Sequence, residues 1–138
     1  MRAAIKAMSP KDKECKEIYA VNSGCPVKYS STCSLACTHY ELDYTLHGAY
    51  AWCPAAIKKG EWIQVSKEEP AMWTDIIIQG RGDWDQWVTS FKVAYTLDGH
   101  QWQLAENSRI FEGSYDRQSK RRVTFNNPIF ARALRIYP

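Results

Sequence analysis

The chain has 138 residues, enough for one domain and too few for two, and 45% of them are hydrophobic, as in an ordinary globular protein. Its 18 basic and 15 acidic residues leave a formal charge of +3, without the concentrated basic stripe of a nucleic-acid-binding protein. No apolar run reaches the roughly 18 residues that cross a membrane, and residues 1–16 lack the apolar centre of a secretory signal peptide.

In chain order, residues 1–27 show little periodicity and are expected to form an irregular N-terminal segment ahead of a domain over 28–138. From Val27 onward, short alternating runs are separated by turn residues, which is typical of an all-β domain. Strands are expected over 61–65, 76–79, 91–96, 101–104, 122–125 and 133–137, with a tight turn at Asp98-Gly99. The spacing predicts an antiparallel β-sandwich or barrel with almost no helix.

The apolar faces of these strands predict the core. Its expected members are Trp62, Ile76, Ile78, Phe91, Val93, Tyr95, Trp102, Phe125, Leu134 and Ile136. Trp87 lies beside a strand and is also expected to be buried. The six tryptophans and eight tyrosines exceed what such a core needs, so some rings are expected at the surface, where aromatic side chains serve recognition.

Five cysteines are present, and four of them precede residue 40. Clustering in a region with little apolar periodicity predicts an oxidising compartment and at least one disulfide among Cys15, Cys25, Cys33 and Cys37. Cys53, beside Pro54, is the leading candidate for an unpaired thiol. The alternative is a zinc site formed by Cys25, Cys33, Cys37 and His39. The absence of a CxxC pair disfavours this alternative. We expect no metal and no cofactor.

Several stretches of the chain stand in the order and at the spacing found in a known family. The most specific is QGRGDWDQWVTSFKV at 79–93. Before it stand AWCPA at 51–55 and GEWIQV at 60–65, and after it stand YTLDG at 95–99, Trp102 and NPIFARALRIYP at 127–138. Over about residues 47–138 the chain therefore resembles discoidin domains, also called coagulation-factor type C domains, and most of all the discoidin-type lectins.

The resemblance implies a galactose-binding-domain-like β-sandwich or jelly roll that carries out no chemistry. Family members usually continue past the position of Pro138, so the chain is expected to lack the family's final strand. The resemblance also implies a binding surface of three loops at one end of the sandwich, here within 29–45, 47–59 and 80–86. It is weak before residue 45, where KYSST at 28–32 resembles the family's first-loop serine motif.

The side chains of these loops indicate which class of ligand is favoured. Aromatic rings can pack on the apolar face of a sugar, while carboxylates and a guanidinium can bind its hydroxyls. The expected ligand-binding residues are therefore Tyr50, Trp52, Arg81, Asp83, Trp84 and Asp85. The two carboxylates beside Trp84 would repel an anionic headgroup, which favours a sugar over phospholipid. Two other interpretations stay open: Trp52 as a plug at the end of the core, and Arg81 paired with Asp83 to hold the loop.

Two functions follow. The first is a lectin-like module for galactose-type sugars, acting in adhesion or recognition on glycans or glycoproteins, as an oligomer or within a larger protein. The alternative is an adhesion module for anionic phospholipid or for a protein, including an integrin through Arg81-Gly82-Asp83. Both place the chain outside the cell or at its surface. His39, His47 and His100 are scattered and belong to no catalytic set, so no enzyme is expected.

Overall fold

The structure is a computed structural model that describes residues 2–8, 27–31, 51–82 and 84–138, the first of these ranges by its backbone alone. The described residues form one antiparallel sheet system of seven strands in the order β1-β3-β7-β4-β5, with β2 on β3 and β6 on β4. The strands are β1 (Arg2–Met8), β2 (Val27–Tyr29), β3 (Ile63–Gln79), β4 (Ser90–Thr96), β5 (Gln103–Leu104), β6 (Phe111–Glu112) and β7 (Arg121–Tyr137), with one short 3-10 helix, η1 (Ala105–Asn107). The expected antiparallel all-β fold with almost no helix is confirmed.

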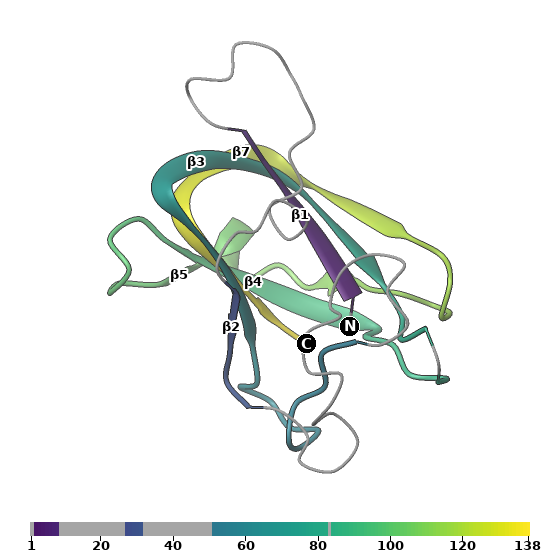
Figure 1. The fold of residues 1–138 in the computed structure, drawn as a ribbon. Coiled ribbons are helices and arrows are strands. Elements are labelled where there is room, and N and C mark those ends of the chain that lie inside the picture. Colours follow the sequence, from purple (N-terminus) through teal and green to yellow (C-terminus); the bar gives the residue numbers. More distant parts are fainter. Residues whose placement is uncertain (1, 9–26, 32–50, 83) are drawn as a thin grey trace.

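Two long strands, β3 and β7, run side by side and bend together, so that each contributes to both layers of the sandwich (Figure 1). The start of β3 pairs with the end of β7, from Ile63 opposite Ile136 to Ser66 opposite Ala133. After a register shift, the end of β3 pairs with the start of β7. The four separate strands expected at 61–65, 76–79, 122–125 and 133–137 are therefore parts of these two. The exposed polar residues around Glu68 mark the bend and not a break in the strand.

The N-terminal residues Arg2–Met8 form an edge strand, β1, which pairs with β3 from Gln79 back to Met72. The expectation that residues 1–27 are irregular is thus wrong for these seven residues. Their sequence, RAAIKAM, contains three alanines and one lysine, which are poor strand formers, and pairing with β3 supplies the hydrogen bonds that stabilise the strand. Residues 9–26 lie outside the described residues, and the domain boundary at 27 stays a prediction.

The core lies between the layers and contains most of the expected side chains. Seven of them are buried as predicted, namely Ile76, Ile78, Phe91, Val93, Phe125, Leu134 and Ile136, while Tyr95 is half-buried and packs against this cluster. Phe111 lies between Phe91 and Phe125, with ring centroids 5.5 and 5.8 Å away. The largest fully buried side chain among the described residues, Trp73, was not expected; its indole N–H donates a 2.7 Å hydrogen bond to the Ala131 carbonyl.

Trp62 and Trp102 do not belong to the core, contrary to the prediction. Both are half-buried on the outer face of the sheet, where the Arg135 guanidinium lies 4.0 Å from each ring centroid. Arg135 Nε also donates to Gln64 Oε1 at 2.9 Å. Trp62 immediately precedes the inward-facing Ile63, so alternation along β3 turns its ring outward, and two aromatic faces stabilise the cation there.

The turn between β4 and β5 forms at Asp98-Gly99 as predicted. Gly99 has φ +87°, a left-handed conformation that glycine adopts without steric cost. The Asp98 carboxylate accepts hydrogen bonds from the backbone N–H groups of Gln101 and His100 at 2.9 and 2.8 Å and from the Thr96 hydroxyl at 3.1 Å. These donors favour the ionised form and lower the pKa of Asp98 to about 2.

Candidate functional site

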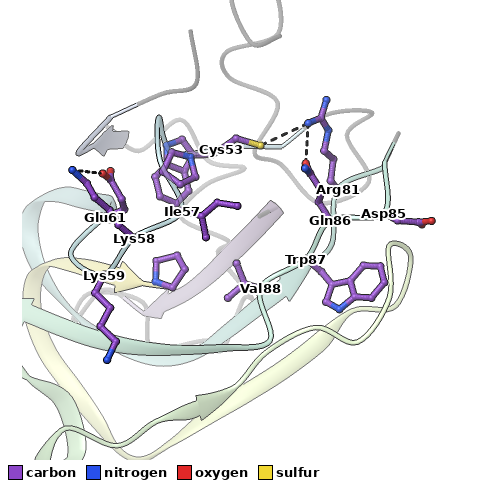
Figure 2. Close-up of a pocket in the computed structure, with 13 residues that line it drawn as sticks. Cys53, Ile57, Lys58, Lys59, Glu61, Arg81, Asp85, Gln86, Trp87 and Val88 are labelled. Carbon is purple, nitrogen blue, oxygen red and sulfur yellow. Dashed lines mark hydrogen bonds and ion pairs between the residues drawn. The ribbon is translucent and has the colours of Figure 1, made fainter. Parts of the chain in front are cut away.

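Two loops at one end of the sandwich border a hollow of about 810 Å³. The 51–61 loop leads into β3, and the 80–89 loop connects β3 to β4. Figure 2 shows Ile57 and Val88 directed toward the centre of the hollow, with Arg81 and Gln86 along one side and Trp87 nearby. The hollow therefore combines apolar, aromatic and charged groups from segments that are distant in the sequence.

The 80–89 loop is closed by its own hydrogen bonds. The backbone N–H of Arg81 donates to the Gln86 carbonyl, and that of Gln86 donates to the Trp84 carbonyl, both at 2.8 Å. The Arg81 guanidinium donates to Gln86 Oε1 at 3.1 Å and reaches across to Cys53 Sγ at 3.8 Å. Arg81 is thereby held between the two loops, with its guanidinium at the wall of the hollow (Figure 2).

A further segment, residues 113–119, braces this loop from outside. The backbone N–H groups of Gly113 and Ser114 donate to the carbonyls of Thr89 and Val88, both at 2.7 Å. Asp85 lies at the edge of the hollow, and its carboxylate is directed outward, where it pairs with Arg117 Nε at 3.2 Å. Nothing in the sequence had assigned residues 113–119 to the loop end.

Asp116 organises the bracing segment. Its carboxylate accepts hydrogen bonds from the Ser119 hydroxyl and backbone N–H, both at 2.6 Å, and from the Gln118 N–H at 2.9 Å. The Ser119 contacts are the main cause that lowers the pKa of Asp116. The segment therefore forms a compact turn beside the 80–89 loop.

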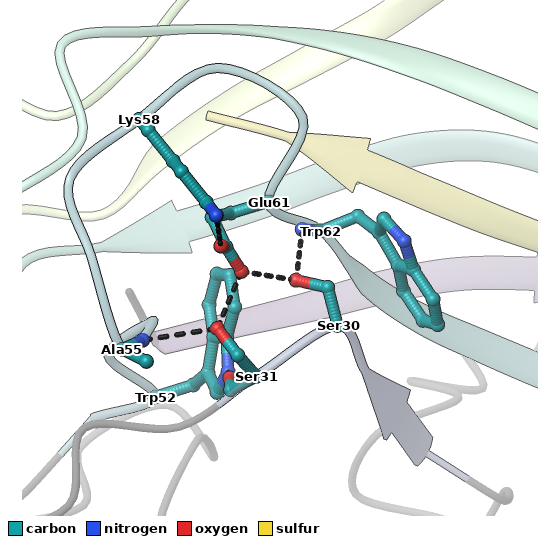
Figure 3. A network of polar contacts seen from close by, with 7 residues as sticks. All are labelled: Ser30, Ser31, Trp52, Ala55, Lys58, Glu61 and Trp62. Carbon is teal, nitrogen blue, oxygen red and sulfur yellow. Dashed lines mark hydrogen bonds and ion pairs between the residues drawn. The ribbon is translucent and has the colours of Figure 1, made fainter.

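The 51–61 loop is attached to residues 30–31, which follow β2 (Figure 3). The Trp52 indole N–H donates to the Ser31 carbonyl at 3.0 Å, and the Ala55 N–H donates to the Ser31 hydroxyl oxygen at 3.0 Å. The expected first-loop serine motif thus includes a serine that supports the neighbouring loop.

Glu61 joins these segments through its carboxylate. The hydroxyls of Ser30 and Ser31 both donate to Glu61 Oε2 at 2.5 Å, and Lys58 Nζ lies 3.7 Å from Oε1 (Figure 3). Hydrogen bonds from Ser30 and Ser31, with a smaller contribution from Lys58, lower the pKa of Glu61 although burial acts in the opposite direction. Glu61 is therefore a buried carboxylate held in its charged form at the base of the hollow.

The predicted site residues occupy different positions. Arg81 and Asp85 of the 80–89 loop and Trp52 of the 51–61 loop line the hollow, while Trp84 is 63% exposed and does not line it. Trp52 is only 3% exposed, which confirms the interpretation that it plugs the end of the core; it cannot offer an open ring face. Tyr50 and Asp83 lie outside the described residues, and with Asp83 so does the aspartate of the Arg81-Gly82-Asp83 tripeptide.

The prediction that Trp87 is buried is wrong, because this ring is 38% exposed and lines the hollow. It precedes β4 by three residues, so the alternation of that strand does not determine its direction. Ile57, at the other wall, is fully exposed. Sequence reasoning gave Glu61 no role at the site, because its distance in sequence from Ser30 leaves no local signal.

Cys53 is a free cysteine at the wall of the hollow, in agreement with its prediction as the unpaired thiol. The other cysteines, and His39 of the alternative zinc site, lie outside the described residues, so the disulfide stays a prediction. Within the part of the chain that the structure describes, no group of three or more side chains is arranged to hold a metal ion, and no helix is long and apolar enough to cross a membrane.

A loop-walled hollow at one end of an antiparallel β-sandwich defines a class of ligand-binding module. The model of the F5/8 type C domain family matches residues 27–138, and the chain belongs to this family, as the resemblance to discoidin domains implied. Domains of this family are binding modules and are generally not catalytic.

Curated relatives include two kinds of protein. The chain is 38% identical to discoidin-2 of Dictyostelium discoideum over 91 residues, which are 66% of this chain and 35% of that protein. It is 37% identical to mouse lactadherin over 93 residues, 64% of this chain and 20% of that protein. The chain thus spans about a third of the length of discoidin-2 and a fifth of that of lactadherin.

Two solved structures illustrate the fold. Wild-type discoidin II of D. discoideum superposes with a TM-score of 0.71 at 30% identity, over 85% of this chain and 49% of that one. The family 32 CBM of C. perfringens NanJ, solved in complex with galactose, gives a TM-score of 0.61 at 13% identity, over 96% of this chain and 86% of that one. The second likeness shows the β-sandwich fold alone.

Proposed function

We propose that this chain is a carbohydrate-binding module for galactose-type sugars. The observation that carries the proposal is the exposed Trp87 ring in the hollow, together with the guanidinium of Arg81 and the amide of Gln86. The indole can pack on the apolar face of a pyranose, while the guanidinium and amide can bind hydroxyls in a fixed geometry. The hydrogen bonds within the 80–89 loop hold these groups in place before a ligand arrives.

Similar proteins support this proposal. The NanJ module was solved with galactose, and the curated relatives include discoidins. Of the residues expected to bind, Arg81, Asp85 and the almost fully buried Trp52 line the hollow, and Trp84 lies in the same loop as Arg81. Tyr50 and Asp83 complete the proposed set.

A shallow, open site of this kind binds single sugars weakly, with dissociation constants on the order of 1 mM. Adhesion or recognition then requires several copies, so the proposal includes an oligomer or a multidomain parent that binds glycans or glycoproteins at the cell surface.

The test is capture on galactose-agarose and on a glycan array, at low and at high salt. Because the proposed contacts are hydroxyl hydrogen bonds and ring stacking, binding should survive high salt. Trp87→Ala should abolish capture while leaving the melting temperature nearly unchanged. Phe130→Ala is the matched control, because Phe130 is a 48% exposed ring in β7 that does not line the hollow. Full capture by Trp87→Ala would refute the proposed site.

A second candidate function is binding to anionic phospholipid. One observation favours it: Ile57 is fully exposed at the loop end, next to Lys58 and Lys59. An apolar tip with adjacent cations suits a negatively charged bilayer, because the tip can enter the interface while the lysines contact headgroups.

Vesicles distinguish the two functions. Phosphatidylserine vesicles should bind the chain at low salt and release it at high salt, and phosphatidylcholine vesicles should not bind. Ile57→Ser should weaken vesicle binding, because it removes the apolar tip. Capture of galactose with no vesicle binding would eliminate the phospholipid function.

A further inference from the structure

The carboxylate of Glu61 accepts hydrogen bonds from the hydroxyls of Ser30 and Ser31, two residues that are distant in the sequence. We infer that Glu61 is a positioning residue, whose charge fixes the 51–61 loop against Ser30 and Ser31 and so sets the wall of the hollow that faces the ligand. The inference rests on the proposed function for what the hollow binds, and on the contacts of Figure 3 for the positioning itself.

The direction of each hydrogen bond requires an acceptor at this position. The Ser31 hydroxyl oxygen accepts the Ala55 N–H at 3.0 Å, and the Ser30 hydroxyl oxygen accepts the Trp62 N–H at 2.9 Å. Each hydroxyl proton is then directed to Glu61, and both reach the same oxygen, Oε2. A carboxylate oxygen accepts two donors readily, and the other oxygen of the pair faces the Lys58 ammonium.

These contacts connect Glu61 to the backbone on both sides of the loop. Ala55 lies before the tip and Trp62 after it, and each is tied to the carboxylate through one serine hydroxyl. Between them the chain turns, with the Lys58 N–H donating to the Ala56 carbonyl at 3.1 Å, and places the fully exposed Ile57 at the wall of the hollow. The orientation of Ile57 and Lys58 toward a ligand therefore depends on one side chain that does not need to touch that ligand.

The substitution Glu61→Gln tests the effect of the negative charge separately from the size of the side chain. The glutamine amide is nearly the same size, but one terminal atom becomes an N–H donor. If the amide nitrogen faces the two serine hydroxyls, their protons lose their acceptor, and if it faces the Lys58 ammonium, two donors are placed against each other. Glu61→Gln should therefore loosen the loop without opening a cavity in the core.

The experiment measures backbone amide hydrogen exchange and galactose-agarose affinity in the full chain. In Glu61→Gln, the amides of Ala55 and Trp62 should exchange about tenfold faster and galactose affinity should fall about tenfold, the effect of losing one charge-assisted hydrogen bond. The amide of Gly113, which donates to Thr89 beside the other loop, should exchange as in the native chain. Asp98→Asn is the matched control, since this carboxylate also accepts hydroxyl and backbone donors but does not line the hollow.

A second pair of variants keeps the test decisive if Glu61→Gln does not fold. Ser31→Ala should reproduce the fast exchange at Ala55 and the loss of affinity, and Ser31→Thr, which restores a hydroxyl, should rescue both. The inference is overturned if Ala55 keeps its native exchange rate in Glu61→Gln or Ser31→Ala, or if exchange rises equally at Gly113, which would indicate general destabilisation. If the native chain captures no galactose, the sugar proposal fails, and the exchange rates still decide the role of Glu61.

Discussion

The two loops that border the hollow are held in opposite ways. The 80–89 loop is closed by backbone hydrogen bonds from Arg81 to Gln86 and from Gln86 to Trp84, and it is braced by the backbone of Gly113 and Ser114. The 51–61 loop is held chiefly by side chains, because the Glu61 carboxylate and the Trp52 indole reach residues 30–31. The 80–89 loop is therefore held mainly by backbone hydrogen bonds, and the 51–61 loop mainly by side-chain hydrogen bonds to residues 30–31.

This difference determines how each loop responds to substitution. Backbone hydrogen bonds do not depend on side-chain identity, so many residues of the 80–89 loop can change without loss of its shape. A side-chain contact across a long loop must offset the entropy of loop closure, and a single substitution removes it. Substitutions at a few positions should therefore disrupt the 51–61 loop, whereas the 80–89 loop should tolerate substitution at most of its positions.

The largest effect is expected at Trp52. Trp52→Ala removes a buried ring and its hydrogen bond to Ser31, and should lower the free energy of unfolding by about 3–5 kcal/mol, as measured by urea denaturation. The corresponding change in the other loop, Trp87→Ala, removes a partly exposed ring and should cost less than about 1 kcal/mol. Equal losses would mean that the two rings contribute equally to the core.

Gly80 is the position where the 80–89 loop should be vulnerable. A Cβ atom there would lie 2.3 Å from the Asp116 carbonyl oxygen, so the bracing segment would have to move. Gly80→Ala should lower the free energy of unfolding by about 1–3 kcal/mol. Thermal denaturation checks this, with Gly60→Ala as a comparison: Gly60 has open space around it and only the strain of its φ of +96°. A neutral Gly80→Ala would show that the bracing contact is unimportant.

The two loops should also differ in how their hydrogen bonds respond to pH. Because its pKa is lowered on folding, Glu61 stabilises the folded chain at pH values above its ordinary pKa of 4.5, and this contribution is lost as the pH falls through the lower value. Acidification should therefore release the Ala55 amide, while the bond from Arg81 N–H to the Gln86 carbonyl, which has no titrating partner, persists. Hydrogen exchange corrected for intrinsic rates measures both; simultaneous release would contradict the comparison.

The smallest effect is expected at the ion pair of Asp85 with Arg117. Both side chains are well exposed, so solvent screens their attraction. Asp85→Asn should change the free energy of unfolding by less than about 0.5 kcal/mol, because the backbone contacts of the loop remain. A double-mutant cycle with Arg117→Ala measures the coupling, and a value above about 1 kcal/mol would show that side chains hold this loop as well.

Much of the fold could be predicted from the sequence because alternation is a local signal. Phe91 and Val93 of β4, and Leu134 and Ile136 of β7, are buried as their spacing indicates. The long strands were divided into shorter ones because the polar residues between their apolar ends look like turns, whereas the register shifts in the β3–β7 pair absorb them.

The site was less predictable, since burial near a strand end depends on neighbours from elsewhere in the chain. Trp52 was open to two interpretations and Trp87 was wrongly expected to be buried, because both lie outside the strands that would set their direction. Arg81 and Asp85 were found because the family resemblance placed their loop at the binding end. The role of Glu61 was missed because its partners are 30 and 31 residues away, and nothing in the sequence near Glu61 indicates them.

The two 17-residue strands have a mechanical consequence. Each passes from one layer of the sandwich to the other as an unbroken peptide chain, in register with its partner on both sides of the bend (Figure 1). Shear between the layers is therefore borne by covalent backbone as well as by the apolar contacts of the interior. One layer therefore cannot unfold while the other stays folded, and the domain should unfold in a single cooperative transition. The midpoint of this transition should be the same whether it is followed at Trp73 in the interior or at Trp102 on the outer face.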